Sequence, residues 1–359
     1  MEYAETLRWK ERCVRDALER IAKLDLERVK VYPTIGMEEP GRYRNKVRLH
    51  RDPSGELGYY QAKGRETVAF PDCLLISESM NENVRKIQEV LDRSESSAPI
   101  LKKIKNITLR ENTKGEGMVI FDSLAKSELP SAFLDSLQET LGMNSKVQSV
   151  WGLNNQGIPE LWWGQGFLKE EILGLSFNLS PLAFLQVNPR QTQKLYRTVF
   201  DWTDIAKESL VWDLYCRIGT ITLALARKAR KIWGIEGNPY AVKDAKRNAD
   251  LNHLTHAEFL QGKVEDVLCQ LNETPDVVVL DLPRAGVDPR VLERLIEAKP
   301  KRIVYVSRDQ GTLARDAGIL ERAGYRVEKV QPVDMFPWAV NVETVVLLLR
   351  RRVHPIMKK

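Results

Sequence analysis

Short apolar segments alternate with helical stretches through the second half of the chain, and this alternation limits the possible fold more than any other feature. The segments are rich in β-branched residues and lie at Leu210–Leu214, Lys231–Ile235, Ala257–Leu260, Val277–Leu280 and Ile303–Val306. Near-continuous apolar strands separated by helices are typical of a parallel sheet covered on both faces. Two terminal runs, Arg326–Val330 and Val342–Leu349, predict an added β-hairpin at the sheet edge. We therefore predict an α/β, doubly wound, Rossmann-like domain over residues 176–359.

The first half of the chain has a different pattern. Between Thr6 and Leu24, apolar residues recur at helical spacing, which predicts a leading helix. Short alternating segments then follow, bounded by the turn signals Asp52-Pro53-Ser54-Gly55, Asn112-Thr113-Lys114-Gly115 and Asn154-Asn155-Gln156-Gly157. Such turns predict antiparallel strands and hairpins. We predict that residues 1–175 form a leading helix and an N-terminal β-rich domain.

Composition excludes several classes of protein. With 43% hydrophobic residues among 359, the chain is too apolar to be disordered, and no apolar run reaches the roughly 18 residues that span a bilayer. The net charge of +6 slightly favours a polyanionic partner. The cysteines Cys13, Cys73, Cys216 and Cys269 form no CxxC pair, so we expect no metal site, no iron-sulfur cluster and no disulfides. The N-terminus has no secretion signal, and we expect a cytoplasmic monomer.

The turn after the first predicted strand of the second half indicates a nucleoside site. It contains a single glycine, Gly219, and an acid, Glu236, ends the next strand about 20 residues further on. An NAD enzyme would need GxGxxG to approach a pyrophosphate. Asp213, at the end of the first strand, would repel phosphate and suits a cationic ligand such as S-adenosylmethionine. An ordinary turn with a solvated glutamate remains the alternative.

Ordered motifs along nearly the whole chain carry a family resemblance. They are Ser180-Pro181 with Phe184, Gln186 and Asn188; Asp213 to Cys216; Gly234 to Glu236; Asp281 to Gly286; Ile303 to Ser307; Thr312 to Asp316; Asp334 to Pro337; Val342 to Thr344; and, in the first half, Tyr43-Arg44-Asn45-Lys46. With these motifs the chain resembles the RNA uracil-C5 methyltransferase family, which modifies rRNA or tRNA with S-adenosylmethionine. Many relatives also carry an N-terminal OB-like module and a four-cysteine iron-sulfur site, both of which we expect this chain to lack.

The resemblance implies covalent catalysis by a cysteine. Relatives add a thiolate to carbon 6 of uracil, the resulting enolate attacks the methyl group, and a general base removes the carbon 5 proton. The position of that cysteine, after Ser307, is occupied by Arg308. Arginine is always protonated and has no lone pair to offer, so Arg308 is predicted to be non-functional as a nucleophile. A neutral surface variation is the alternative interpretation of Arg308.

Further departures fall in the same region. Asp309-Gln310 replaces the family's Asn-Pro, Leu282 replaces a proline, and Asn341 replaces a histidine two residues before the general base. Arg217 replaces a glycine that lets the cofactor loop approach its ligand, so we expect this side chain to hinder S-adenosylmethionine. The pattern indicates loss of activity on a retained fold.

Other functional positions match the family. By resemblance the cofactor would be held by Gln186, Tyr215, Thr220, Glu236 and Asp281. Glu343 matches the general base, and Asp281 is expected to act with it in the methyl transfer. Asp281 and Glu343 could equally be structural acids paired with Arg284 or Arg315.

A basic segment in the first half predicts RNA contact. If residues 42–51 form a strand, four cations share one face, namely Arg42, Arg44, Lys46 and Arg48. A stripe of this kind suits phosphate tracking, although charged strand faces are often only solvated. Of Trp162 and Trp163, at most one could stack on bases, because neighbours in a strand point to opposite faces.

Three functions therefore stay open. The chain is either an RNA uracil-C5 methyltransferase with an unidentified nucleophile, or a catalytically inactive RNA-binding paralogue. Methylation of a nitrogen or oxygen, which needs no covalent addition, is the third.

Overall fold

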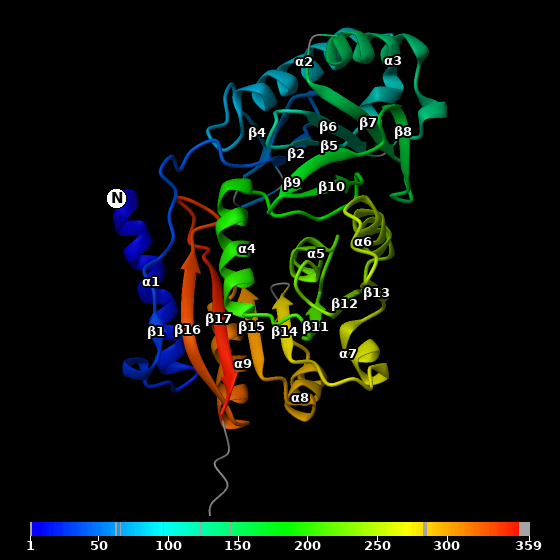
Figure 1. The fold of residues 1–359 in the computed structure, drawn as a ribbon. Helices are drawn as coiled ribbons and strands as arrows, with labels where there is room; N and C mark the ends of the chain where they lie inside the picture. The colour runs from blue at the N-terminus through cyan, green and yellow to red at the C-terminus, as the bar shows by residue number, and fades with distance from the viewer. Residues whose placement is uncertain are drawn as a thin grey trace, which may run out of the picture. The chain divides into compact units, whose positions relative to one another are not determined.

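The computed structural model describes residues 2–351, except residues 62, 65, 96, 123, 144 and 283–285. The chain forms two compact units, shown in Figure 1. The first unit comprises residues 1–40, 172–175 and 190–359, and the second comprises residues 41–171 and 176–189. Each unit has its own sheet and its own apolar core.

The first unit contains an eight-stranded sheet in the order β1-β16-β17-β15-β14-β11-β12-β13. Its strands are β1 (Lys30–Val31), β11 (Leu210–Leu214), β12 (Lys231–Glu236), β13 (Ala257–Gln261), β14 (Val277–Asp281), β15 (Arg302–Ser307), β16 (Tyr325–Val333) and β17 (Glu343–Arg350). Strands β11 to β15 are parallel, and β17 is antiparallel to both β15 and β16. The order reverses between β11 and β14, which confirms the predicted doubly wound α/β fold. The predicted hairpin is present, but β1 pairs with β16 beyond it and forms the edge.

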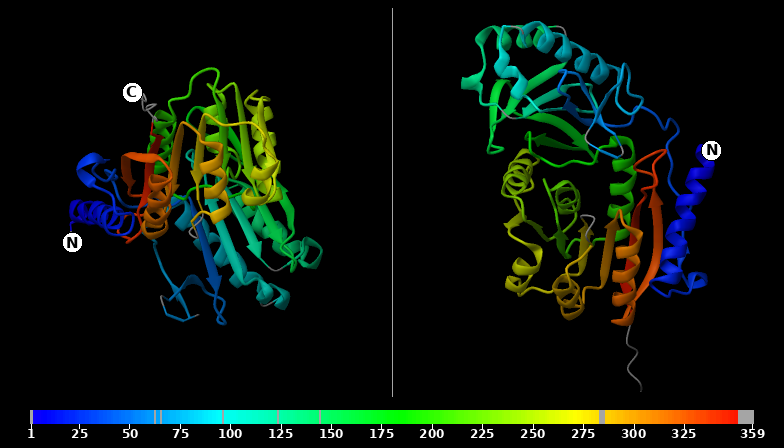
Figure 2. Two further views of the ribbon diagram at one scale, coloured as in Figure 1. Left: turned by 90° about the horizontal axis from the view of Figure 1, so that it is seen from below. Right: turned by 180° about the vertical axis from the view of Figure 1, so that it is seen from behind.

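Helices cover both faces of this sheet (Figure 2). They are α1 (Tyr3–Arg20), α4 (Pro189–Thr203), α5 (Thr220–Ala226), α6 (Pro239–Leu251), α7 (Val264–Val267), α8 (Pro289–Ala298) and α9 (Gln310–Arg322). One continuous core joins α1, α7, α8 and α9 to the side chains that one sheet face presents, including the fully buried Trp212 and Tyr305. Alternate strand residues such as Val211 and Val279 are buried on the opposite face.

The leading helix packs against the first unit's sheet through α9 and β16. The sequence predicted this helix, and its apolar stripe of Val14 and Leu18 is completely buried. On the same helix, Lys10 is buried and its Nζ lies 2.5 Å from Oδ1 of Asp334, just after β16. Tyr3 donates its hydroxyl to the other oxygen of Asp334 at 2.6 Å. Polar contacts therefore tie α1 to the β16–β17 loop.

The second unit contains a seven-stranded sheet in the order β4-β3-β2-β5-β6-β7-β8, and a two-stranded ladder of β9 and β10. The strands are β2 (Lys46–Arg51), β3 (Leu57–Tyr60), β4 (Thr67–Ala69), β5 (Asn106–Glu111), β6 (Gly117–Asp122), β7 (Val147–Leu153), β8 (Pro159–Gly164), β9 (Leu168–Ile172) and β10 (Leu175–Leu179). The three predicted turns join β2 to β3, β5 to β6 and β7 to β8. All pairs in the larger sheet are antiparallel except β6 with β7.

Two helices of the second unit were absent from the sequence prediction. They are α2 (Glu78–Glu95) and α3 (Ser131–Gln138), and both contribute to the core of this unit. In α2 the buried residues Met80, Val84, Ile87 and Leu91 recur at helical spacing, so the signal was present in the sequence.

The two compact units divide the chain differently from the predicted boundary at residue 175. Residues 1–40 belong with the α/β unit because α1 and β1 complete its sheet and core, and residues 176–189 belong with the β-rich unit. Local patterns show that a helix exists but not which sheet it covers, so they could not place α1. Within the described residues, no helix has the length and apolarity needed to cross a membrane.

Candidate functional site

The candidate site lies at the carboxyl ends of the parallel strands in the first unit, where the strand order reverses. The loop after β11 and the end of β14 meet at this switch point, and the end of β15 and the start of β17 lie beside it. Ligands of open α/β sheets bind at this edge.

Asp213 does not face a ligand, contrary to our electrostatic argument. Its side chain is completely buried, and its Oδ2 accepts a hydrogen bond from the hydroxyl of Thr222 at 2.5 Å. Burial raises the pKa of Asp213 to about 7, so at neutral pH this carboxyl is only partly ionised. Negative charge at this edge must come from other acids.

The loop from β11 to α5 has an unusual backbone. Tyr215, Arg217 and Gly219 have φ values of 65°, 54° and 82°, all in the left-handed region. Glycine adopts this region freely, whereas a side chain with a Cβ atom destabilises it by roughly 1–2 kcal/mol. A strained conformation at Arg217 is thus maintained by its surroundings.

An ion pair holds Arg217 across the switch point. Its Nη1 lies 2.9 Å from Oδ2 of Asp281 at the end of β14, and its Nη2 lies 3.5 Å from the other oxygen. The side chain of Arg217 is 19% exposed and that of Asp281 is 7% exposed. Burial raises the pKa of Asp281, and the nearby Arg217 and Arg308 act in the opposite direction. Asp281 is therefore the counter-ion of an arginine, which favours the structural interpretation of this acid.

Glu236, at the end of β12, also has partners in the same loop. Its Oε2 accepts from the backbone N–H of Arg217 at 3.1 Å, and its Oε1 accepts from the N–H of Asn238 at 2.7 Å. The residue is partly exposed. Each carboxylate oxygen has a further lone pair, so Glu236 could still accept hydrogen bonds from ribose hydroxyls.

The second arginine of the site, Arg308, follows β15. The β15–β17 ladder pairs Ser307 with Thr344, and this register brings Arg308 beside Glu343. The Nε of Arg308 lies 3.8 Å from Oε1 of Glu343, and its guanidinium lies 5.5 Å from the ring centroid of Phe336. Glu343 is 1% exposed. Both acids expected to act in the family reaction are thus next to an arginine.

The residues after Arg308 have structural contacts of their own. Asp309 caps α9, since its Oδ1 accepts from the N–H of Thr312 at 2.7 Å. Gln310 donates from its side chain to the carbonyl of Val342 at 2.8 Å. The family's Asn-Pro is therefore replaced by a helix cap and a link to the β16–β17 loop.

Cys216 is the cysteine nearest to this site in sequence, and its thiol is poorly suited to attack. The residue is 5% exposed, and its Sγ is buried beside Gly234 on β12. Burial, together with Asp213 and Glu236, raises the pKa of Cys216 well above its ordinary value. A thiol of this kind is protonated at neutral pH and is a weak nucleophile.

Other predicted residues are placed as follows. Tyr215 is partly buried against the core, and Thr220 is buried and donates to the hydroxyl of Tyr196 at 3.4 Å. Arg315 pairs with Asp316 at 2.7 Å rather than with Asp281 or Glu343. Arg284, the other proposed partner, lies outside the described residues. Gln186 belongs to the second unit, where its carbonyl accepts from the side chain of Asn45 at 3.3 Å.

Sequence reasoning missed three aromatic residues near this edge. Tyr196 on α4 contacts Thr220, Phe336 lies under Arg308, and Trp338 is exposed on the β16–β17 loop. The motif Asp334 to Pro337 pointed to this loop, but no local pattern indicates which of its side chains is buried.

The predicted basic stripe is shorter than expected. Strand β2 begins at Lys46, so Arg42 and Arg44 precede it, and Arg42 has a φ of 46° that no strand allows. Arg42 lies 2.8 Å from Asp72 and 3.8 Å from Glu78, which offset its charge. The expectation that all four cations share one strand face is therefore wrong, because the chain turns before Lys46.

The remaining cations of the stripe form a smaller group. On β2, Lys46 and Arg48 face away from the buried Val47 and Leu49, as predicted. Burial, with Arg110 and Arg48 nearby, lowers the pKa of Lys46 to about 8. Arg48 is 55% exposed and pairs with Asp122 at 2.6 Å.

The two adjacent tryptophans of β8 both contribute to packing. Trp162 is 4% exposed and stacks on Phe121 with ring centroids 5.0 Å apart. Trp163 is partly buried against the same core. Core packing therefore accounts for Trp162, as we expected for one of the pair.

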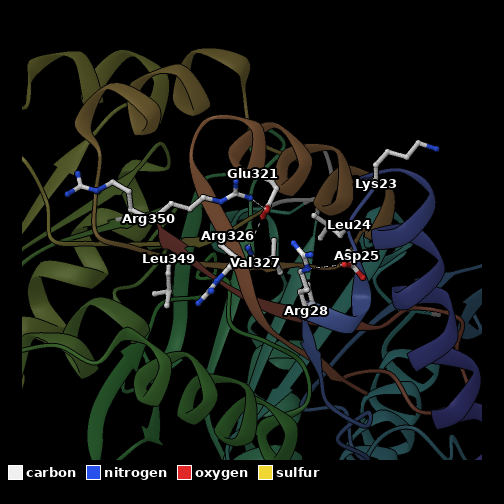
Figure 3. A pocket seen from close by; sticks show the side chains of 11 residues that line it. Lys23, Leu24, Asp25, Arg28, Glu321, Arg326, Val327, Leu349 and Arg350 are labelled. Carbon is white, nitrogen blue, oxygen red and sulfur yellow. Dashed lines mark hydrogen bonds and ion pairs between the residues drawn. The ribbon is translucent and has the colours of Figure 1, made fainter. Parts of the chain in front are cut away.

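A cavity of about 800 Å³ in the first unit lies away from this site (Figure 3). It lies between the segment after α1, the start of β16 and the end of β17. Its lining includes Arg28, Arg326, Arg350 and Glu321. Since Leu349 pairs with Arg302 at the start of β15, the cavity lies at the amino edge of the parallel strands. None of the residues predicted for the chemistry contributes to it.

The sheet order and the switch-point loop define the S-adenosylmethionine-dependent methyltransferase fold. Residues 174–351 match the family model of tRNA (uracil-5-)-methyltransferases. A protein described as an uncharacterized RNA methyltransferase from Clostridium acetobutylicum is 37% identical over 98% of this chain and 80% of its own length. A similarly described protein from Listeria innocua is 37% identical over 97% of this chain and 80% of its own. The chain belongs to the RNA uracil-C5 methyltransferase family.

A solved structure supports the same assignment over both units. The tRNA (uracil-54, C5)-methyltransferase of Pyrococcus abyssi, in complex with S-adenosyl-L-homocysteine, has a TM-score of 0.79 and is 25% identical to this chain. The match covers 97% of this chain and 84% of the archaeal one.

The residues of this chain do not fit S-adenosylmethionine in the arrangement seen here. A cationic ligand at the switch point needs an available carboxylate, and Asp281 is already neutralised by the guanidinium of Arg217. That guanidinium also adds a positive charge at the switch point, and it would repel the sulfonium and ammonium cations of the ligand. Glu236 keeps its capacity to accept hydrogen bonds from ribose hydroxyls.

Proposed function

We propose that this protein is an RNA-binding member of the uracil-C5 methyltransferase family that does not perform the family's covalent methylation. The observation that carries the proposal is Arg308, which follows β15 at the expected nucleophile position and lies beside the expected base, Glu343, at 3.8 Å. A guanidinium has no lone pair with which to attack carbon 6 of uracil.

The cofactor side supports the same proposal. Methyl transfer requires S-adenosylmethionine at the switch point, and we infer that Arg217 competes with it for Asp281. Both differences act in one direction, because each places a cation next to a carboxylate that the reaction would need.

We infer that RNA binding is the retained property. The Pyrococcus abyssi relative is a tRNA methyltransferase, and we propose tRNA or rRNA as the partner of this protein. Arg44 and Lys46 in the second unit would contact phosphates, with smaller contributions from Arg42 and Arg48, because acidic side chains partly neutralise both.

The deciding experiment measures methyl transfer and RNA binding separately. The protein is incubated with methyl-labelled S-adenosylmethionine and RNA that lacks uracil-C5 methylation, beside the Arg308→Cys and Arg308→Cys/Arg217→Gly variants. We expect no label in RNA from the natural protein, and salt-dependent RNA binding in a filter assay. Label recovered as 5-methyluracil from the natural protein would overturn the proposal, and label on a nitrogen or oxygen would identify a different methyltransferase.

A further inference from the structure

The loop between β16 and β17 carries an exposed aromatic side chain beside the candidate site. Trp338 is 55% exposed and has a φ of 66°, a conformation that bulky residues rarely adopt. The loop leaves β16 after Val333 and enters β17 at Glu343, which are paired, so it projects beyond the carboxyl edge next to Arg308. Val340 on the same loop is 72% exposed, so the loop presents more than one exposed apolar side chain, which indicates a contact surface.

The indole of Trp338 packs against Tyr3, whose hydroxyl makes two hydrogen bonds. Its ring centroid lies 5.3 Å from that of Tyr3, with an interplanar angle of 50°. The hydroxyl of Tyr3 donates to Asp334 at 2.6 Å and accepts from the backbone N–H of Met37 at 2.9 Å. The left-handed backbone and the support from Tyr3 hold the indole before any ligand arrives, which reduces the entropy lost on binding.

Arg308 offers hydrogen-bond donors at the same edge. Its side chain is 28% exposed, and its guanidinium lies over Phe336, two residues before Trp338. The contact with Glu343 is 3.8 Å long, beyond hydrogen-bond distance. Within the described part of the chain the guanidinium makes no hydrogen bond, so its donors can reach a ligand.

We propose that Trp338 and Arg308 form a subsite for single-stranded RNA at this edge. Trp338 stacks on a nucleobase with its exposed face, and Arg308 donates to an oxygen of the RNA. Single-stranded RNA is recognised in this way, by stacking on aromatic rings and by arginine donors. The inference rests on the proposed RNA-binding function and assigns to Arg308 a role in recognition.

Fluorescence anisotropy with a labelled single-stranded RNA of about 15 nucleotides tests the stacking contact. Trp338→Ala should weaken binding about 5- to 150-fold, and Trp338→Phe should keep most of the affinity. Trp9→Ala is the matched control, because Trp9 is 39% exposed on α1 and should leave affinity unchanged. Thermal unfolding of each variant separates lost folding from lost binding.

Arg308→Gln identifies which oxygen the guanidinium contacts. A phosphate contact predicts that the slope of log affinity against log salt falls by about 0.7. A base contact predicts weaker binding with an unchanged slope, and no effect on a strand whose bases have been removed. Arg326→Gln, at the opposite edge beside the cavity in Figure 3, controls for the loss of one positive charge.

The outcomes separate this inference from the proposed function. If the natural protein binds RNA and both Trp338→Ala and Arg308→Gln bind equally well, the subsite is refuted and the proposed function stands. If the natural protein does not bind RNA at all, both are refuted. Equal losses in Trp338→Ala and Trp9→Ala would also refute the subsite, because the effect would not depend on this loop.

Discussion

The Arg217→Gly variant tests the ion pair at the switch point most directly. The change removes a guanidinium that lies 2.9 Å from Asp281 and leaves that carboxylate, 7% exposed, without its counter-ion. It also introduces the residue that best tolerates the φ of 54° at this position. The two effects oppose each other, and their magnitudes decide the outcome.

Removing one partner of a buried ion pair destabilises a protein by about 3–5 kcal/mol. The side chain of Arg217 is 19% exposed, so solvent screening reduces this to about 2–4 kcal/mol. Relief of the left-handed backbone strain at this position stabilises the variant by about 1–2 kcal/mol. The greater freedom of glycine in the unfolded chain destabilises the variant by about 0.5–1 kcal/mol. We therefore expect Arg217→Gly to lower the free energy of unfolding by about 2 kcal/mol at pH 8.

The loss should depend on pH in a direction set by Asp281. Burial raises the pKa of this carboxyl, and without Arg217 that pKa should rise further. A carboxyl whose folded-state pKa is raised destabilises the fold as pH increases through that pKa, and protonation at low pH removes the effect. The deficit should therefore shrink as the pH falls from 8 towards 5.

Urea unfolding at several pH values measures this effect, with Asp281→Asn as the matched control. The Arg217→Gly/Asp281→Asn protein removes both charges of this ion pair, so neither is left unpaired, and we expect most of the stability to return. Calorimetry with S-adenosyl-L-homocysteine supplies the second readout, with micromolar binding expected for Arg217→Gly and none for the natural protein. Equal stability of Arg217→Gly and the natural protein at pH 8, with no gain in ligand binding, would refute the reasoning.

Three further predictions concern other buried or partly buried charges. Burial raises the pKa of Asp213 to about 7, so the free energy of unfolding of Asp213→Asn should increase relative to that of the natural protein by at most about 4 kcal/mol between pH 4 and pH 8. Urea unfolding at both pH values measures this difference, and a difference that does not change with pH would contradict the prediction. RNA affinity should fall as the pH rises from 7 to 9, because Lys46 has a pKa of about 8 and loses its proton in this range. Filter binding should show no such pH dependence for Lys46→Gln. If the full pH dependence persists in this variant, Lys46 is not its cause. Lys10→Met should destabilise the protein by about 3 kcal/mol, because buried Asp334 loses its counter-ion, and Lys10→Met/Asp334→Asn should recover much of the lost stability. Thermal unfolding measures both variants. An unchanged melting temperature for Lys10→Met would show that the ion pair does not stabilise the fold.

Elements with a strong local pattern could be predicted from the sequence. The apolar runs from β11 to β15 lie within one or two residues of their predicted bounds, because burial on both faces leaves a continuous apolar signature. The leading helix was also predicted from its stripe of Val14 and Leu18. Its membership of the α/β unit depends on long-range packing against α9 and β16, which no local pattern reports.

The contacts within the candidate site could be predicted only in part. The sequence identified Arg217 and Arg308 as departures from the family, but it did not show that each lies beside a particular acid. Arg217 and Asp281 are 64 positions apart in sequence, and their contact depends on β11 and β14 being neighbours in the sheet. The contact of Arg308 with Glu343 depends on the β15–β17 register.

Because of these contacts, the presence of Asp281 and Glu343 is not by itself evidence of catalytic activity. Asp281 and Glu343 match residues that the family uses in catalysis, and their presence alone would favour an active enzyme. A buried guanidinium, however, requires a carboxylate nearby, because removing that partner destabilises the fold by several kcal/mol. Arg217, whose side chain is 19% exposed, lies 2.9 Å from Asp281, so folding alone is a sufficient reason to keep this acid. The more exposed Arg308 lies 3.8 Å from Glu343 and gives a weaker structural reason to keep that second acid. The presence of the two acids therefore does not show that the protein is active. Variants that remove Arg217 and Arg308 distinguish a structural acid from a catalytic one.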